Sequence, residues 1–179
     1  MKRETLTLAA PEVRFAADDS GTFSGYAAVF GELVASHNEM VKSGAFTRSL
    51  AETRGQPPAM FWNHNPDEPI GVWTDLTEDA RGLKVAGRIV TDTSRGRDVQ
   101  ALLKAGAVTG LSIGFKARRE ERGAKGVRIL TDVDLVEISL TSLPAARNAR
   151  VTQVRHAAAP AETANFIQAV RRAATALTR

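Results

Sequence analysis

The sequence contains no cysteine, only three histidines and few aromatic residues. Without cysteine, the chain has no disulfide, no thiol nucleophile and no Cys-ligated zinc or iron–sulfur centre. His37, His64 and His156 form no His-x-x-x-His pair, so we expect no metal and no other cofactor. Aromatic residues make up 6% of the chain. No stripe of aromatic and arginine side chains indicates stacking on bases, so we expect no nucleic-acid partner.

Long apolar runs are also missing. No segment approaches the roughly 20 apolar residues of a transmembrane helix, and residues 1–8 lack the apolar stretch of a signal peptide. We therefore expect a protein that stays in the cytoplasm and has no membrane partner. With 179 residues, 43% of them hydrophobic and 25% charged, the chain can form one globular domain with an appended tail. Its net charge of +4 is spread along the sequence, which indicates solvated surface.

The stretch at residues 109–115 holds one serine, Ser112, between two glycines. Its large apolar residues alternate at strand spacing, so Ser112 is predicted to face away from them, on an uncrowded side of the strand. A serine that attacks a carbonyl needs such access, and flanking glycines leave main-chain N–H groups free to stabilise an oxyanion. The alternative is a half-buried strand with one small polar residue.

Residues 110–114 also match the G-x-S-x-G pattern of α/β-hydrolases. In that fold the serine lies at a strand-to-helix turn and is followed along the chain by an acid and then a histidine. Here the predicted strand continues past Ser112, the helix precedes it, and the only downstream histidine is His156 in the tail. The pattern therefore does not indicate an α/β-hydrolase.

The rest of the chain predicts at least six short strands and two or three helices. We expect a hairpin within residues 1–30, a short helix at 45–51, a strand at 59–64, a hairpin over 69–90, a capped helix at 93–106, the Ser112 strand, a charged turn at 116–123 and a strand at 134–140. Because most neighbouring strands form hairpins, an antiparallel β-rich domain is predicted, as a barrel or a sandwich. Beyond residue 155, a linker and an amphipathic helix are predicted.

Two further residues are candidates for catalysis beside Ser112. His64 is predicted where a strand meets a loop, and it could take the serine proton and return it to a leaving amine. Glu137 stands alone among apolar residues on a strand expected to pair near Ser112, so it could fix the histidine tautomer. Taken singly, His64 could be a turn residue and Glu137 a solvated strand residue. The alternative acids are Asp134 and Asp67, and the alternative base is His37.

A set of short segments, in matching order, resembles the prohead maturation proteases of tailed bacteriophages. These serine proteases are considered to share a fold and ancestry with the herpesvirus assemblins. The resemblance covers roughly residues 10–152. Its segments are GYAAVF at 25–30, SGAF at 43–46, WNHN at 62–65, PIG at 69–71, GL at 82–83, GLSIGF at 110–115, VEISL at 136–140 and PA at 144–145.

The resemblance implies Ser112 as nucleophile, His64 as base and Glu137 as third member of the triad. Assemblins have a second histidine in the place of Glu137, and a charged carboxylate should hold the imidazole more firmly. Assemblins also carry an arginine-bearing loop after that strand, whose backbone supports the oxyanion. Arg147 and Arg150 lie in the corresponding region. The fold implied is a β-rich α+β fold with an assemblin-like closed antiparallel β-barrel surrounded by a few helices.

The resemblance further implies a serine endopeptidase that works inside the prohead, in the host bacterial cytoplasm. Such an enzyme cuts scaffold protein or the scaffolding segment of the major capsid protein, and finally itself, and is a homo-oligomer. We assign residues 1–152 to the protease domain and 153–179 to the linker and amphipathic helix, a segment for docking or self-cleavage. Two alternatives remain at this stage: a non-catalytic basic scaffold or nucleic-acid-binding module, and a degenerate protease that acts as an assembly factor.

Overall fold

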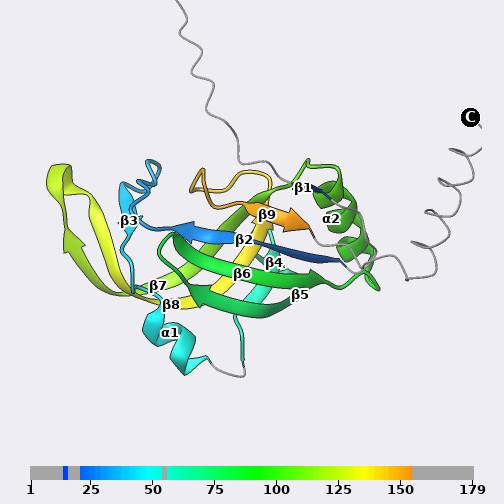
Figure 1. The fold of residues 1–179 in the computed structure, drawn as a ribbon, viewed down its shortest axis with the longest axis horizontal. Coiled ribbons are helices and arrows are strands. Elements are labelled where there is room, and N and C mark those ends of the chain that lie inside the picture. Colours follow the sequence, from blue (N-terminus) through cyan, green and yellow to red (C-terminus); the bar gives the residue numbers. More distant parts are fainter. Residues whose placement is uncertain (1–13, 16–20, 54–55, 155–179) are drawn as a thin grey trace, which may run out of the picture.

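The computed structural model describes residues 14–15, 21–53 and 56–154. Within them, nine strands form one sheet in the order β1-β9-β2-β6-β5-β4-β8-β3, and β7 pairs with β8 outside this order (Figure 1). The strands are β1 (Arg14–Phe15), β2 (Thr22–Val29), β3 (Glu39–Val41), β4 (Ala59–Trp62), β5 (Asn65–Glu78), β6 (Gly82–Ile89), β7 (Gly110–Arg122), β8 (Arg128–Thr141) and β9 (Val151–Val154). The α-helices are α1 (Thr47–Glu52) and α2 (Ser94–Lys104). Neither is long and apolar enough to cross a membrane.

The second predicted hairpin is confirmed as β5 and β6. These strands pair antiparallel from Gly71 opposite Ile89 to Glu78 opposite Leu83. Along β6, buried Leu83, Val85 and Ile89 alternate with exposed lysine and arginine, as expected of a strand with one buried and one wet face. The hairpin is longer than predicted, because β5 begins at Asn65.

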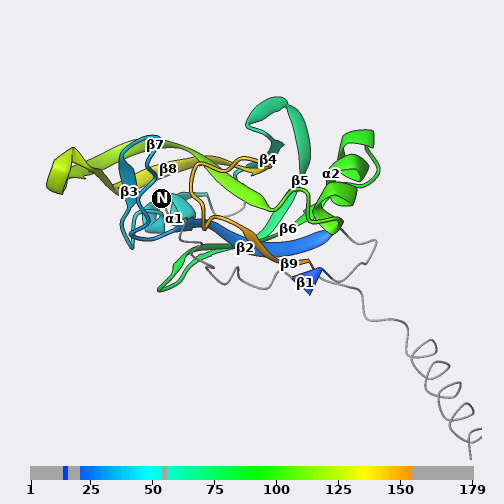
Figure 2. The same ribbon diagram turned by 90° about the horizontal axis from the view of Figure 1, so that it is seen from above.

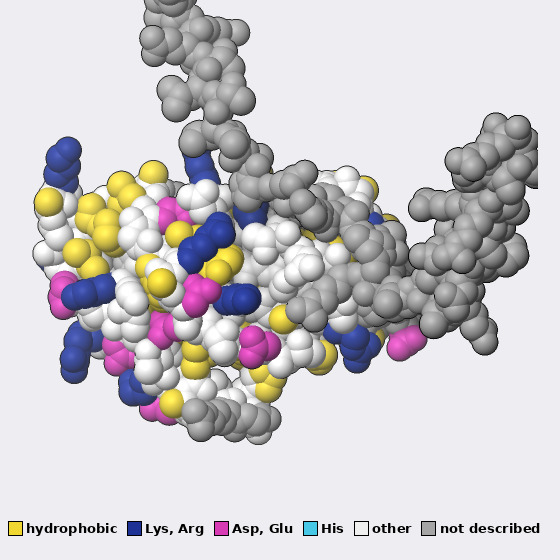
Figure 3. All heavy atoms as spheres, viewed as in Figure 1, with side chains coloured by type: hydrophobic (Ala, Val, Ile, Leu, Met, Phe, Trp, Pro, Cys, Tyr) yellow, Lys and Arg dark blue, Asp and Glu magenta, His cyan; other side chains and the backbone are white. Residues whose placement is uncertain are grey.

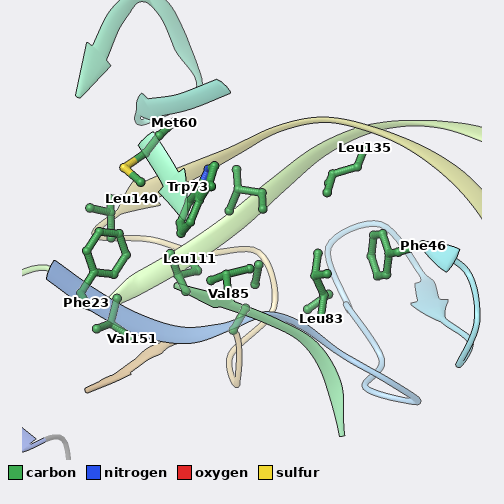
Figure 4. Close-up of a cluster of buried hydrophobic side chains, with 14 of the residues drawn as sticks. Phe23, Phe46, Met60, Trp73, Leu83, Val85, Leu111, Leu135, Leu140 and Val151 are labelled. Carbon is green, nitrogen blue, oxygen red and sulfur yellow. The ribbon is translucent and has the colours of Figure 1, made fainter. Parts of the chain in front are cut away.

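The helices predicted at 45–51 and 93–106 are also present, as α1 and α2, whereas the amphipathic helix predicted beyond residue 155 lies outside the described residues. Thr93 caps α2, because its side chain accepts a hydrogen bond of 3.0 Å from the N–H of Gly96, and this satisfies one of the free donors of the first turn. The core side chains labelled in Figure 4 come from β2, from β4 to β9 and from the residue before α1, and Phe23 packs edge-on against Trp73 with ring centroids 5.6 Å apart. The labelled members are Phe23, Phe46, Met60, Trp73, Leu83, Val85, Leu111, Leu135, Leu140 and Val151.

The predicted N-terminal hairpin is wrong. β1 pairs parallel with β9, and β2 pairs antiparallel with both β6 and β9. β9 therefore lies between the two strands that were expected to pair with each other. Local turn residues could not predict this, because the partner strand comes from the other end of the domain.

The predicted turn at 116–123 is also wrong. β7 continues to Arg122, and the chain reverses only at residues 123–127, where Lys125 and Gly126 have positive φ. Figures 1 and 2 show this hairpin of β7 and β8 extending away from the body of the sheet. From Lys116 onward β7 is exposed at every residue, so its charged sequence reflects solvent on both faces rather than a turn.

The fold is β-rich α+β, but the expected closed antiparallel barrel is not what the structure shows. Among the described residues, the strand order is an open path whose end strands, β1 and β3, are two and three residues long. The sheet is also mixed, because β3 and β4 run parallel to β8. The start of β7 meets the chain just before β9 only through an isolated antiparallel bridge of Gly110 with Arg150, beside which Leu111 N donates to Ala149 O at 2.9 Å and Val151 N donates to Thr109 O at 2.8 Å.

Candidate active site

The pairing of β7 with β8 brings the candidate serine and acid to one face. Ser112 lies directly opposite Ser139, and Gly114 lies directly opposite Glu137. Opposite residues of an antiparallel pair project to the same face, as do residues two apart on one strand. All four residues therefore share a face, with Ser112 and Glu137 on a diagonal across the strand pair.

Gly114 leaves the room that the Glu137 side chain occupies. A Cβ atom at position 114 would lie 2.4 Å from Glu137 Oε1 and 2.8 Å from its Cγ. The Glu137 side chain therefore crosses directly over the Gly114 backbone. From the sequence, the glycines beside Ser112 were expected to leave main-chain N–H groups free to donate. The structure shows a second reason for glycine at position 114, which is that any Cβ there would collide with the Glu137 side chain.

His64 reaches the same face from the turn between β4 and β5. β4 runs parallel to β8, with Ala59 beside Glu137 and Phe61 beside Ser139. Asn63 and His64 then reverse the chain with φ of 50° and 62°, values in the left-handed region that non-glycine residues seldom adopt. The backbone N–H of His64 donates to Ser139 Oγ at 3.0 Å, which holds the turn against β8.

The imidazole of His64 and the carboxylate of Glu137 form the closest polar contact of the site. His64 Nδ1 lies 2.5 Å from Glu137 Oε1, and Glu137 is 7% exposed whereas the His64 side chain is 45% exposed. An ionised carboxylate can only accept hydrogen bonds, so the Nδ1–H donates and Nε2 of the neutral ring is left as an acceptor. This is the tautomer that a general base requires.

Ser112 and His64 line one cavity of about 570 Å³. Ser112 is only 9% exposed, so its hydroxyl is reached from this cavity rather than from open surface. No hydrogen bond joins Ser112 to His64 in the structure; such bonds often tighten only when substrate binds. Most of the wall is apolar, formed by Ala27, Ala28, Val29, Val34, Val41, Leu111, Ile113, Phe115, Ala117, Ala145 and Ala146.

The alternative acids and base are placed differently. Asp134 forms an ion pair with Arg118, and Asp67 is exposed on β5. His37 does line the cavity, but its Nδ1 contacts the hydroxyl of Ser36 at 3.0 Å, and no carboxylate of the described residues bonds to its ring. The structure thus brings together Ser112, His64 and Glu137.

Arg147 and Arg150 lie in the loop after β8. Arg150 Nε donates to the carbonyl of Arg147 at 2.9 Å, and its Nη1 lies 3.4 Å from Thr109 Oγ1. Arg150 therefore ties this loop to the residue that precedes β7. Neither arginine is among the residues that line the cavity, whereas Ala145 and Ala146 of the same loop are.

Ser139 was not predicted as a site residue from the sequence. It is fully buried, and its Oγ donates to Glu137 Oε2 at 2.7 Å while it accepts from the backbone of His64. The period of two along the strand places it on the same face as Glu137, so the signal was present once that strand was recognised. Among the described residues, no three His, Asp or Glu side chains gather as metal ligands would.

The sequence matches proteins of tailed phages. A family model described as caudovirus prohead serine protease matches residues 5–163. The prohead protease of Enterobacteria phage HK97 is 33% identical over 156 residues, which cover 85% of this chain and 68% of that protein. The capsid polyprotein of Pseudomonas phage PAJU2 is 34% identical over 107 residues, which cover 55% of this chain and 16% of that protein.

Two solved structures share the fold. The bacteriophage T4 capsid assembly protease has a TM-score of 0.57 at 12% identity, covering 69% of this chain and 82% of that one. The KSHV protease, in complex with a hexapeptide phosphonate inhibitor, has a TM-score of 0.51 at 17% identity, covering 73% and 63%. At these identities the similarity concerns the fold alone.

Proposed function

The chain belongs to the caudovirus prohead serine protease family, and on this basis we propose that it is a serine endopeptidase with Ser112 as nucleophile, His64 as general base and Glu137 as the third member of the triad. One observation carries the assignment. His64 Nδ1 lies 2.5 Å from the buried Glu137 carboxylate, while His64 and Ser112 line the same cavity.

The proposed reaction is acyl transfer in two steps. Ser112 Oγ attacks the scissile carbonyl carbon while His64 Nε2 takes the hydroxyl proton. The imidazolium, stabilised by Glu137, gives this proton to the leaving amine, and the C–N bond breaks to leave an acyl-enzyme. Water then attacks the ester with His64 as base, and the second product leaves as Ser112 recovers its proton.

The oxyanion of each tetrahedral intermediate needs donors that are fixed in advance. We assign this role to main-chain N–H groups beside the cavity, in the loop that contains Ala145 and Ala146. Arg147 and Arg150 then act through the loop backbone, because the Arg150 guanidinium bonds to the Arg147 carbonyl and approaches Thr109. The Arg150 side chain thus holds the loop rather than the substrate, and Arg147 takes part through its backbone carbonyl.

The proposed substrates are the scaffold protein, or the scaffolding segment of the major capsid protein, and the chain itself. The HK97 relative is named a prohead protease and the PAJU2 relative a capsid polyprotein, which supports a role in capsid maturation. We place the enzyme inside the prohead, in the host cytoplasm, as a homo-oligomer. Residues 1–152 would form the protease domain and 153–179 a segment for docking or self-cleavage; residues 155–179 lie outside the described part of the chain.

The charge distribution does not favour the alternative of a nucleic-acid-binding module. Lys and Arg side chains are scattered among Asp and Glu on the face seen in Figure 3, and several arginines are paired with carboxylates. Examples are Arg48 with Asp132 at 2.8 Å and Arg128 with Glu39 at 3.1 Å. Among the described residues visible in this view, Lys and Arg form no continuous cationic track.

A fluorophosphonate probe tests the assignment without knowledge of the cleavage site. The probe phosphonylates an activated serine hydroxyl and releases fluoride. We expect one adduct, mapped to Ser112 by peptide mass spectrometry, which disappears in Ser112→Ala and forms far more slowly in His64→Ala. An adduct that persists in Ser112→Ala, or that forms equally fast without His64, would show that the triad is wrong.

A further inference from the structure

We propose that Ser139 is a positioning residue of the active site, which fixes both the Glu137 carboxylate and the turn that carries His64. The proposal rests on the proposed function, since it concerns the same site. Ser139 is fully buried and is not among the residues that line the cavity, so it would not touch substrate. It would act through the acid and the base.

The Ser139 hydroxyl holds one oxygen of Glu137. Glu137 Oε2 accepts from Ser139 Oγ at 2.7 Å, and Oε1 contacts His64 Nδ1 at 2.5 Å. The terminal torsion of a glutamate is soft, and one hydrogen bond leaves it free to swing. With a donor on each oxygen, rotation of the carboxylate breaks two charge-assisted hydrogen bonds at once. Oε1 is therefore kept aimed at the His64 ring.

The same hydroxyl also holds the backbone of His64. A hydroxyl can donate one hydrogen bond and accept others through its lone pairs. Ser139 does both, because it donates to Glu137 Oε2 and accepts from His64 N at 3.0 Å. Both Asn63 and His64 are in the left-handed region, a conformation that persists only where surrounding contacts enforce it. Besides Ser139, the turn is held by Asn63 N, which donates to Leu140 O at 3.0 Å.

The position of Ser139 in the sheet explains why one residue can hold both the Glu137 carboxylate and the His64 backbone. It lies on β8 between β7 and β4, opposite Ser112 on one side and beside Phe61 on the other. It is therefore the strand position at which the three segments that carry nucleophile, base and acid meet. Full burial of Ser139 keeps water from replacing its hydroxyl.

Replacement of Ser139 by alanine keeps the strand but removes both hydrogen bonds. The carboxylate can then rotate away from His64 Nδ1, and the turn loses one of the two hydrogen bonds that its backbone N–H groups donate to β8. The cavity wall is unchanged, so probe binding should be unaffected while the chemical step slows. We expect the rate of the chemical step to fall about 10- to 100-fold, as the loss of a hydrogen bond to a charged group implies.

Ser49 of α1 offers a matched control, because its hydroxyl also bonds to strand β8. It is also buried, at 2% exposed, and its Oγ accepts from Leu135 N of β8 at 2.9 Å. Ser49→Ala thus removes a buried serine hydroxyl that accepts a backbone N–H, as Ser139→Ala does. It touches neither Glu137 nor His64, so it reports the effect of lost stability alone.

The experiment uses the full chain and the fluorophosphonate probe. The maximal rate of labelling and the probe concentration for half-maximal rate are measured for wild type, Ser139→Ala, Ser49→Ala and Ser112→Ala, with melting temperatures alongside. The downfield proton resonance of His64 Nδ1–H, identified by its loss in His64→Gln, gives a readout that is independent of activity. We expect Ser139→Ala to lower the maximal rate alone and to shift or broaden this resonance, and Ser49→Ala to change neither.

Two results would overturn the proposal: Ser139→Ala with the wild-type rate and resonance, or an equal loss of rate in Ser49→Ala. A failure of the proposed function looks different, because wild type would then label no faster than Ser112→Ala. In that case the His64 Nδ1–H resonance alone tests whether Ser139 positions the ring. An unchanged resonance in Ser139→Ala would show that the hydroxyl does not position the ring.

Discussion

A methyl group at position 114 would collide with the acid of the proposed triad. The Cβ of Gly114→Ala would lie 2.4 Å from Glu137 Oε1 in the present backbone. Ordinary van der Waals contact for such a pair is about 3.4 Å, so the carboxylate would have to retreat by about 1 Å. The hydrogen bonds of 2.5 Å to His64 and 2.7 Å to Ser139 would both approach or exceed the limit at which a hydrogen bond remains effective.

The expected cost to catalysis is about 100-fold, the loss that a misplacement of about 1 Å causes in a catalytic group. This corresponds to about 2.7 kcal/mol of transition-state stabilisation. The assay is the maximal rate of fluorophosphonate labelling at Ser112, followed by intact mass, with the melting temperature as a check on folding. The Gly114→Ala chain should fold, because alanine adopts the extended backbone of β7 without strain.

Gly123→Ala is the matched control, at the far end of the same hairpin. There the added Cβ would meet Ile129 Cδ1 at 2.8 Å, the end of a flexible side chain that can move aside. We expect this variant to label at the wild-type rate. A folded Gly114→Ala chain that also labels at the wild-type rate would refute the reasoning, since Glu137 would then not need its present position.

The remaining predictions concern the triad and one ion pair. Ser112→Ala and His64→Ala should each lower the rate of proteolysis on the order of 10⁶-fold, and Glu137→Ala should lower it less, on the order of 10⁴-fold, as in a related triad. Near-wild-type cleavage by any of the three variants would remove that residue from the assignment. Arg48 lowers the pKa of Asp132 in the folded state, mainly through a direct hydrogen bond. The pair therefore stabilises the fold at pH values above the unfolded-state pKa of Asp132. This stabilisation is lost as the pH falls through the lower pKa of the folded state. The free energy of unfolding of Asp132→Asn should therefore lie below that of wild type at neutral pH and converge with it under strongly acidic conditions, and an offset that is constant with pH would contradict the pairing.

Local patterns were sufficient to predict the elements whose determinants are local. The alternation of Leu83, Val85 and Ile89 predicted one strand of the β5–β6 hairpin, and Thr93 predicted the start of α2. The charged run after Lys116 was misread as a turn, because exposure on both faces of a strand gives no alternation. Charge alone indicates solvent and does not distinguish a loop from a projecting hairpin.

Strand partners could not be predicted from local sequence. The pairing of β1 with β9 and of β4 with β8 joins segments far apart in the chain, and the open order of the sheet depends on these long-range choices. For the site, the ordered set of motifs was sufficient to nominate Ser112, His64 and Glu137. The roles of Gly114 and Ser139 depend on the β7–β8 register, which decides which side chains face each other.

The central claim, proteolysis by Ser112 of a capsid precursor and of the chain itself, is tested most directly by intact mass spectrometry. Wild type and Ser112→Ala are each incubated at high concentration, alone and with the precursor of the major capsid protein. We expect the precursor to lose a segment, and the chain to lose a C-terminal piece, only with wild type. If both proteins keep their full mass with wild type under assembly conditions, or if Ser112→Ala yields the same fragments, the account is wrong.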